Sequence, residues 1–153
     1  MDQRLLVIDD SEELAEMIAD HFDELGYAMD VAYNGRDAVD VLAKGFSGVV
    51  LLDYRLPDVD GLELLDRIAD LPVTAKVIMI TAHASIGMAM EAVQSKGAFY
   101  VHSKGEESML ERLTGTVTNA FAQLNLEQKL QSLEDQMGSR YSFASIITQS
   151  REM

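Results

Sequence analysis

Five polar residues follow apolar runs of the sequence, close to the points where buried strands would end. They are Asp9, Asp10, Asp53, Thr81 and Lys104. Carboxylates brought together with a single lysine repel one another unless a cation joins them. A hard divalent ion with oxygen ligands, by preference Mg²⁺, fits such a cluster. If the fold gathers these residues, the pattern predicts a magnesium site.

Asp53 has the most specific position of the five. It comes directly after four consecutive aliphatic residues, Val49–Leu52, and shortly before Pro57, which is typical of a strand buried on both faces. An aspartate held in this way can act as a nucleophile and form an aspartyl phosphate. A metal ion and Lys104 would neutralise the phosphoryl oxygens, and Thr81 would supply a hydroxyl for a hydrogen bond.

Five apolar strand-like runs alternate with helix-period segments and supply the framework for these residues. The runs are Leu5–Ile8, Tyr27–Ala32, Val49–Leu52, Val77–Ile80 and Ala98–Val101. Alternation of this kind predicts an α/β fold in which a doubly wound parallel sheet is covered by helices on both faces. Five strands fit the order 2-1-3-4-5, which brings the ends of the first, third and fourth strands together at the switch point.

Helix signals between the runs support this order. Ser11 and Asn34 are expected to cap the first two helices. The expected apolar positions of the third helix are Leu62, Leu65 and Ile68, and those of the fourth are Ile86, Met90 and Val93.

The C-terminal region predicts one long helix, from Glu106 to about Met137, with the pattern ending at Gly138. We expect a first domain over 1–120, a helical linker over 121–138, and over 139–153 the start of an output domain or a tail. The linker carries an apolar stripe with four, three, four spacing at Leu126, Leu130, Leu133 and Met137. This spacing fits a short dimerising coiled coil or one amphipathic helix folded back on its own domain.

Composition limits the possible functions. A formal charge of −14 over 153 residues argues against direct nucleic acid binding by this chain. The absence of cysteine excludes disulfides and thiolate metal sites. The sequence shows neither a signal-peptide pattern nor an apolar run long enough for a membrane span, so we expect a cytoplasmic protein without a membrane partner.

Together these motifs resemble the receiver domains of two-component response regulators over roughly residues 3 to 120. The match lies in the acidic pair, the run Leu-Leu-Asp-x-x-x-Pro-Asp-x-x-Gly around Asp53, Thr81-Ala82, and Lys104 after Gly97. The resemblance implies that Asp53 accepts a phosphoryl group from a histidine kinase. It also implies roles for Thr81 as the switch hydroxyl and Lys104 as the ion-pair partner of the phosphate.

The same resemblance implies a ligand set for the metal. Asp10, Asp53 and the backbone carbonyl of Arg55 would bind Mg²⁺, and Asp9 would help through water. Phosphorylation would then shift the face formed by the fourth helix and fifth strand and alter a homodimer formed through that face, the linker helix, or both.

A narrower resemblance concerns the run Ile80-Thr81-Ala82-His83-Ala84-Ser85-Ile86 and the end of the chain, Phe143 to Met153. It is similar to sigma-54-dependent activators of the nitrogen-regulator type, in which a linker joins the receiver to an AAA+ ATPase. This implies a role in transcription control, with the chain ending just inside the ATPase.

Two positions depart from the receiver pattern. Gly105 follows the lysine where the family usually has proline, and Val101 stands at the usual aromatic switch position. Alternate residues of a strand point to opposite faces, so Tyr100 and His102 are not expected to replace an aromatic residue at 101.

Two other functions remain as alternatives. The departures leave room for a receiver-like interaction module that is never phosphorylated. An aspartate-nucleophile phosphatase of the haloacid-dehalogenase type would need a second aspartate two residues after the nucleophile, where this chain has Arg55.

Overall fold

The computed structural model describes residues 3–82, 85–105 and 107–140. Within these residues, five strands and five α-helices alternate along the chain, with one π-helical segment after α4. The strands are β1 (Arg4–Ile8), β2 (Ala28–Ala32), β3 (Ser47–Asp53), β4 (Thr74–Thr81) and β5 (Tyr100–Ser103). The helices are α1 (Glu12–Glu24), α2 (Gly35–Ala43), α3 (Gly61–Ala69), α4 (Ile86–Met90), the π-helix η1 (Glu91–Ser95) and α5 (Met109–Arg140).

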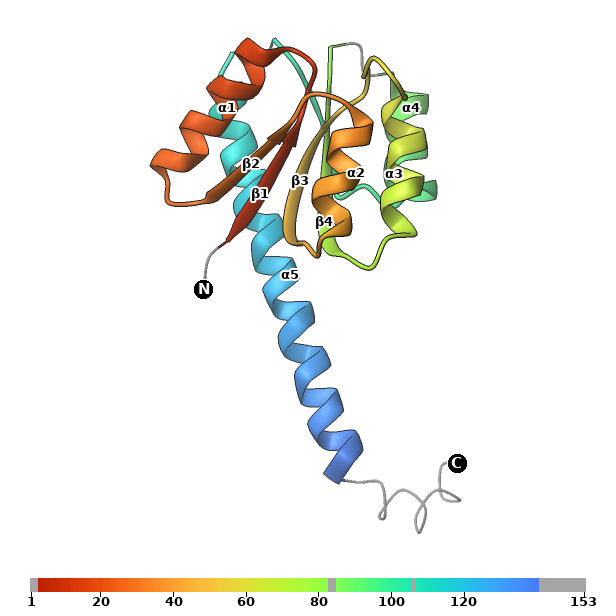
Figure 1. Ribbon diagram of the computed structural model, residues 1–153. Helices are drawn as coiled ribbons and strands as arrows, with labels where there is room; N and C mark the ends of the chain where they lie inside the picture. Colours follow the sequence, from red (N-terminus) through yellow and green to blue (C-terminus); the bar gives the residue numbers. More distant parts are fainter. Residues whose placement is uncertain (1–2, 83–84, 106, 141–153) are drawn as a thin grey trace. The chain divides into compact units, whose positions relative to one another are not determined.

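The strands form one parallel sheet in the order β2-β1-β3-β4-β5, so the predicted fold class and strand order are confirmed (Figure 1). The register pairs Ile8 with Leu52 and Asp53 with Ile80. The carboxyl ends of β1, β3 and β4 therefore meet at one edge of the sheet, as the switch-point rule requires.

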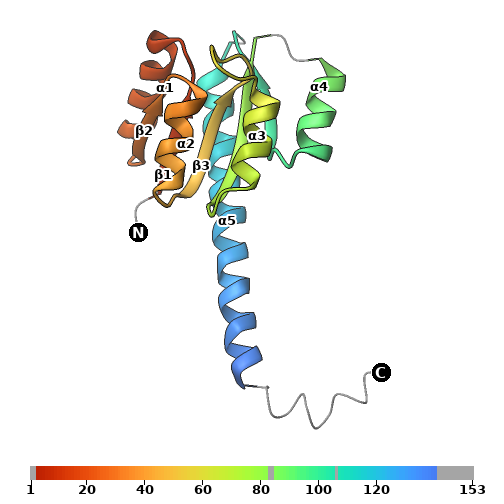
Figure 2. The same ribbon diagram turned by 45° about the vertical axis from the view of Figure 1, so that its right-hand side comes forward.

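Side chains of alternate strand residues build a separate core on each face of the sheet. One core joins Leu6, Val50 and Met79 to buried residues of the helices α2 and α3, and Ala92 of η1 belongs to it. The helices α2 and α3 lie side by side over this face of the sheet (Figure 2). The three central strands are buried on both faces, because each face is covered by helices.

On the opposite face, α1 packs beside the first turns of α5. The rings of Tyr27 and Phe121 stack with centroids 5.4 Å apart, and Phe22 meets Tyr27 edge-on at 5.5 Å. The side chains of His21 on α1 and Thr114 on α5 are 2.7 Å apart. This packing connects the start of α5 to the sheet through side chains far apart in sequence.

The helix starts follow the capping signals of the sequence. Ser11 accepts a hydrogen bond from the backbone N–H of Leu14, and Asn34 accepts one from that of Asp37. Both predicted caps are therefore confirmed. They satisfy N–H groups that have no partner within the helix.

The fourth helix differs from the prediction. The α-helical part ends at Met90 and continues as the π-helix η1, and the expected apolar face is largely exposed. Ile86 is 80%, Met90 51% and Val93 42% exposed. The core contacts of this segment are made instead by Ala92, which is fully buried, and by the partly buried Met88.

The helix α5 also differs from the prediction, because it continues through Gly138 to Arg140. One glycine costs a helix only about 1 kcal/mol, which neighbouring turns can absorb.

The chain divides into one compact unit ending at Phe121 and a second beginning at Ala122. In the second unit the stripe Leu126, Leu130, Leu133 and Met137 is about half exposed. No helix of the described ranges, α5 included, combines the length and the apolar character needed to cross a bilayer.

Candidate functional site

The structure gathers all five predicted polar residues at the carboxyl edge of the sheet. Asp53 and Thr81 are the last residues of β3 and β4, and the other three follow the ends of β1 and β5. A pocket of about 280 Å³ opens at this edge. Its lining residues are Asp10, Asp53, Arg55, Thr81, Ala82 and Lys104.

Lys104 forms the electrostatic centre of this site. Its ammonium nitrogen lies 3.0 Å from an oxygen of Asp9 and 3.0 Å from an oxygen of Asp53. Both carboxylates are almost fully buried, with side chains 3% and 6% exposed, whereas 19% of the lysine side chain is exposed. Asp53 is therefore less open to solvent than its position at a strand end suggested.

Backbone groups fix Asp9 beneath the pocket. Its own N–H donates to the carbonyl of Ala32 at 3.1 Å, which continues the pairing of β1 with β2. The backbone N–H of Ser11 donates to its carboxylate at 2.9 Å. Sequence reasoning missed this second contribution of Ser11, because an N-cap signal does not show where the backbone N–H of the cap residue points.

The electrostatics of the metal-free site raise the pKa of Asp53. Burial raises the pKa of Asp53 from 3.8 to about 6, with a further upward contribution from the Asp9 carboxylate. The hydrogen bond and charge of Lys104 and the backbone N–H of Arg55 act in the opposite direction. Asp53, the nucleophile candidate, is thus ionised above about pH 6 even without a metal ion.

Lys104 remains a cation in this environment. Burial disfavours its charge, but the hydrogen bonds that Lys104 donates to Asp9 and Asp53, with the charges of these carboxylates, outweigh burial and raise the pKa of Lys104. The backbone N–H of Lys104 also donates to the carbonyl of Thr81 at 2.7 Å. This bond extends the pairing of β4 with β5 and directs the lysine side chain across the end of β4.

The donor set suits a divalent cation. Asp9, Asp10 and Asp53 each offer a carboxylate oxygen, and these oxygens all lie within 4.8 Å of one another. Three carboxylates against one ammonium leave a deficit of two positive charges, which a single divalent ion would supply. Oxygen donors are the preferred ligands of Mg²⁺.

Arg55 contributes to the site through its backbone. It lines the pocket, and its N–H is hydrogen-bonded to the Asp53 carboxylate. The assignment of its carbonyl as a metal ligand stays a prediction.

The two departures from the receiver pattern each have a local structural setting. Gly105 has φ +80°, a backbone conformation that the ring of proline forbids. Val101 packs against the core that α2, α3 and η1 share. Tyr100 and His102 have rings 4.8 Å apart, and His102 contacts Thr116 of α5 at 2.7 Å. Alternation along β5 therefore separates these two rings from the position of Val101.

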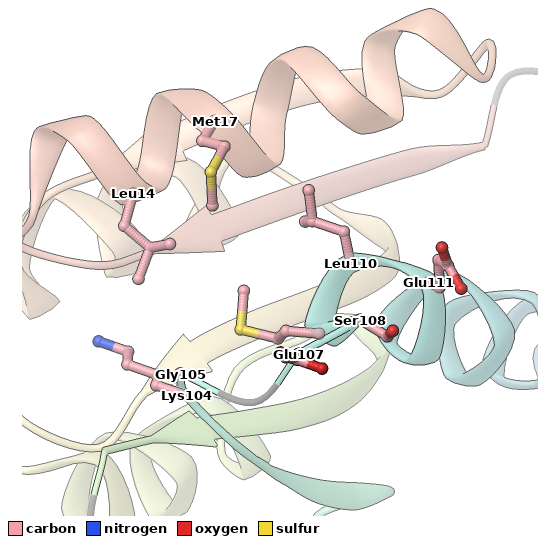
Figure 3. A pocket seen from close by; sticks show the side chains of 9 residues that line it. Leu14, Met17, Lys104, Gly105, Glu107, Ser108, Leu110 and Glu111 are labelled. Carbon is pink, nitrogen blue, oxygen red and sulfur yellow. The ribbon is translucent and has the colours of Figure 1, made fainter.

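A second hollow lies on the other side of Lys104, between α1 and the start of α5 (Figure 3). It measures about 540 Å³, and Leu14 and Met17 point into it from α1 while Leu110 faces them from α5. Lys104 borders both hollows, so the polar pocket has an apolar surface directly beside it.

Comparison with known proteins agrees with the receiver pattern of the sequence. The sequence matches the response regulator receiver domain family over residues 5–114. It is 27% identical to the regulatory protein AtoC of Escherichia coli over 150 residues, which cover 98% of this chain and 32% of that protein. The chain spans about a third of the length of the curated relatives that it matches first.

Solved structures share the fold. The receiver domain of a LuxO repressor protein from Vibrio parahaemolyticus superposes with a TM-score of 0.76 at 29% identity, covering 85% of this chain and 98% of that one. The beryllofluoride-activated NtrC4 receiver domain dimer gives a TM-score of 0.71 at 34% identity, covering 79% and 98%. With the family match over most of its first unit and this site at the sheet edge, the chain belongs to the receiver domains of two-component response regulators.

Proposed function

We propose that Asp53 is the phosphoacceptor of this receiver and takes a phosphoryl group from a histidine kinase. The observation that carries the proposal is the contact of its buried carboxylate with Lys104 in a pocket that also holds Asp10 and Thr81. An aspartate at a strand end is rigid beneath and reachable from the pocket. This is what a nucleophile for phosphoryl transfer needs.

In the transfer, a carboxylate oxygen of Asp53 forms a bond to phosphorus, and the bond from phosphorus to the histidine nitrogen of the donor breaks. The nitrogen keeps the electron pair of that bond. Lys104, which forms an ion pair with Asp53, stays close to this carboxylate and stabilises the negative charge of the phosphoryl group. Thr81, at the neighbouring strand end, offers its hydroxyl to a phosphoryl oxygen.

Mg²⁺ would be held by Asp10 and Asp53 together with the carbonyl of Arg55, with Asp9 close by. When bound, it supplies positive charge that neutralises the phosphoryl oxygens during transfer. The support for this assignment is the cluster of three carboxylates and its deficit of positive charge.

The proposed output is a change in self-association that controls transcription. Two apolar surfaces support a homodimer: the face with Ile86, Met90 and Tyr100, and the linker stripe of α5. The similarity to AtoC and to the NtrC4 receiver dimer supports an output of the sigma-54-dependent type. We place this activity in the cytoplasm, where the kinase would deliver the phosphoryl group.

Beryllofluoride provides a direct test of the proposed site, because it forms an aspartyl phosphate analogue. Fluorine NMR should show bound beryllofluoride only when Mg²⁺ is present, and the signal should be absent in Asp53→Asn. Binding that is equally strong in Asp53→Asn would exclude Asp53 as the acceptor.

A further inference from the structure

The loop between β3 and α3 supplies one of the groups that contact the Asp53 carboxylate. Arg55, the second residue after Asp53, lines the pocket and donates its backbone N–H to that carboxylate. The position of residue 55, and hence of this N–H, depends on the conformation of residues 54–60. Contacts that fix this loop therefore also fix the Arg55 N–H beside the carboxylate.

The base of the loop is closed by its own backbone. The N–H of Gly61 donates to the carbonyl of Tyr54 at 2.6 Å, and Arg55 forms an antiparallel bridge with Asp60. A Cβ atom at position 61 would lie 2.8 Å from the Cα of Tyr54 and 2.7 Å from the Cε of Met79, so only glycine fits there. The four residues 56–59 form the tip of this closed loop.

Asp58 attaches the tip to another element, the N-terminus of α2. Its two carboxylate oxygens accept the backbone N–H groups of Gly35 at 2.9 Å and of Arg36 at 3.0 Å. Beside it, Val59 is buried against Gly35 so closely that a Cβ there would lie 2.4 Å from the Val59 side chain. Polar and apolar contacts thus hold the tip at one place on α2.

These hydrogen bonds complete the capping of α2. Asn34 already accepts the N–H of Asp37, and Asp58 takes the two preceding donors. The N–H of Gly35 in particular lowers the pKa of Asp58, so the carboxylate is ionised at neutral pH. Asp58 borders a different hollow, with Asn34 and Asp40, and acts from outside the phosphoacceptor pocket.

We propose that Asp58 is a positioning residue of the phosphoacceptor site, which ties the β3–α3 loop to α2 and so keeps the N–H of Arg55 on the Asp53 carboxylate. The proposal rests on the proposed function, because it assumes that Asp53 and its neighbours bind Mg²⁺ and accept a phosphoryl group. It adds a residue whose contribution acts through Arg55.

The test measures Mg²⁺ affinity by titration calorimetry, together with the rate of phosphorylation by acetyl phosphate. Asp58→Ala should weaken Mg²⁺ binding about tenfold, the usual cost of losing an outer partner of a metal site, and should slow phosphorylation. Asp58→Asn keeps one acceptor and should fall between Asp58→Ala and the wild type. It also serves as the test if Asp58→Ala does not fold.

Two control variants separate positioning from other effects. Asp40→Ala removes the same charge from the same hollow without touching the loop. Asn34→Ala removes a cap from the same end of α2 and lowers stability, but it leaves both Asp58 bonds in place. Both controls should change the Mg²⁺ dissociation constant by less than about twofold, because the exposed charge of Asp40 is screened and Asn34 carries no charge.

The outcomes distinguish this proposal from the proposed function. A wild-type protein that binds no Mg²⁺ and accepts no phosphoryl group overturns both. If the wild type binds Mg²⁺ and Asp58→Ala binds it equally well, only the role of Asp58 is overturned. A loss of the same size in Asp40→Ala or Asn34→Ala also overturns it, because charge or helix stability would then explain the effect.

Discussion

The ammonium nitrogen of Lys104 lies 3.0 Å from a carboxylate oxygen of Asp53, although the strands that carry these residues are not neighbours. β4 lies between β3 and β5, so the lysine side chain crosses the end of β4, where Thr81 stands. Nucleophile candidate, hydroxyl and ammonium are therefore supplied by three successive strands at one edge. A phosphoryl group on Asp53 would have the hydroxyl and the ammonium as its neighbours.

Removing the lysine charge should destabilise the metal-free protein. Lys104→Met leaves Asp9 and Asp53 buried without a counter-charge, and we expect a loss of about 3 kcal/mol in the free energy of unfolding at pH 8. Lys96→Met is the matched control, because it breaks the more exposed pair with Asp66 and should therefore cost less stability than Lys104→Met. Urea denaturation measures both, and equal losses would contradict the central position given to Lys104.

The raised pKa of Asp53 predicts the pH dependence of stability. Between about pH 4 and pH 6 the folded protein keeps a proton that the unfolded chain releases, so stability falls as pH rises through this window. Asp53→Asn should therefore stabilise the protein by about 3 kcal/mol at pH 8 in the presence of a chelator. The gain should vanish near pH 4. A gain that does not change with pH would show that the Asp53 carboxyl has no raised pKa.

Mg²⁺ affinity should also follow the ionisation of Asp53. Because a metal ligand must lose its proton, the apparent dissociation constant should rise about tenfold for each pH unit below 6 and level off above it. Calorimetric titrations between pH 5 and pH 8 test this directly. At pH 8, Mg²⁺ at ten times its dissociation constant should add about 1.4 kcal/mol to stability. Unchanged affinity across pH 6 would place the metal away from Asp53.

Self-association should depend on the apolar stripe of the second unit. Replacing both Leu130 and Leu133, each about half exposed, by aspartate introduces charge where the coiled-coil interpretation expects apolar contact. Sedimentation velocity should show a loss of dimer in this variant. Asn125→Asp, an exposed change on the same helix, is the control and should keep the dimer. A dimer that persists in the double variant would favour the face with Ile86 and Tyr100.

The sequence predicted the fold and the edge of the site well, because both depend on strongly apolar strands and the polar residues that follow them. Val49–Leu52 is fully buried, and the position of Asp53 follows from it. The exposure of Ile86 and Met90 was not predictable, because an apolar helix pattern does not distinguish a face that packs on the core from one that has no partner. The same pattern also gives no sign of the π-helical turn that follows.

The contact of Asp58 with the N-terminus of α2 could not be predicted from the sequence either. A Pro-Asp pair predicts a turn, but nothing in the sequence shows that the carboxylate reaches a helix more than twenty residues away. Such contacts depend on the packing of neighbouring loops at the sheet edge, and they become visible only when the strand order and register are fixed.

Intact-protein mass after incubation with acetyl phosphate tests the central claim most directly. Wild type and Asp53→Asn are compared with Mg²⁺ and with a chelator. The account predicts one phosphoryl adduct, formed only by the wild type and only with Mg²⁺. An adduct of equal yield on Asp53→Asn, or none on a folded wild type that binds Mg²⁺, would contradict it.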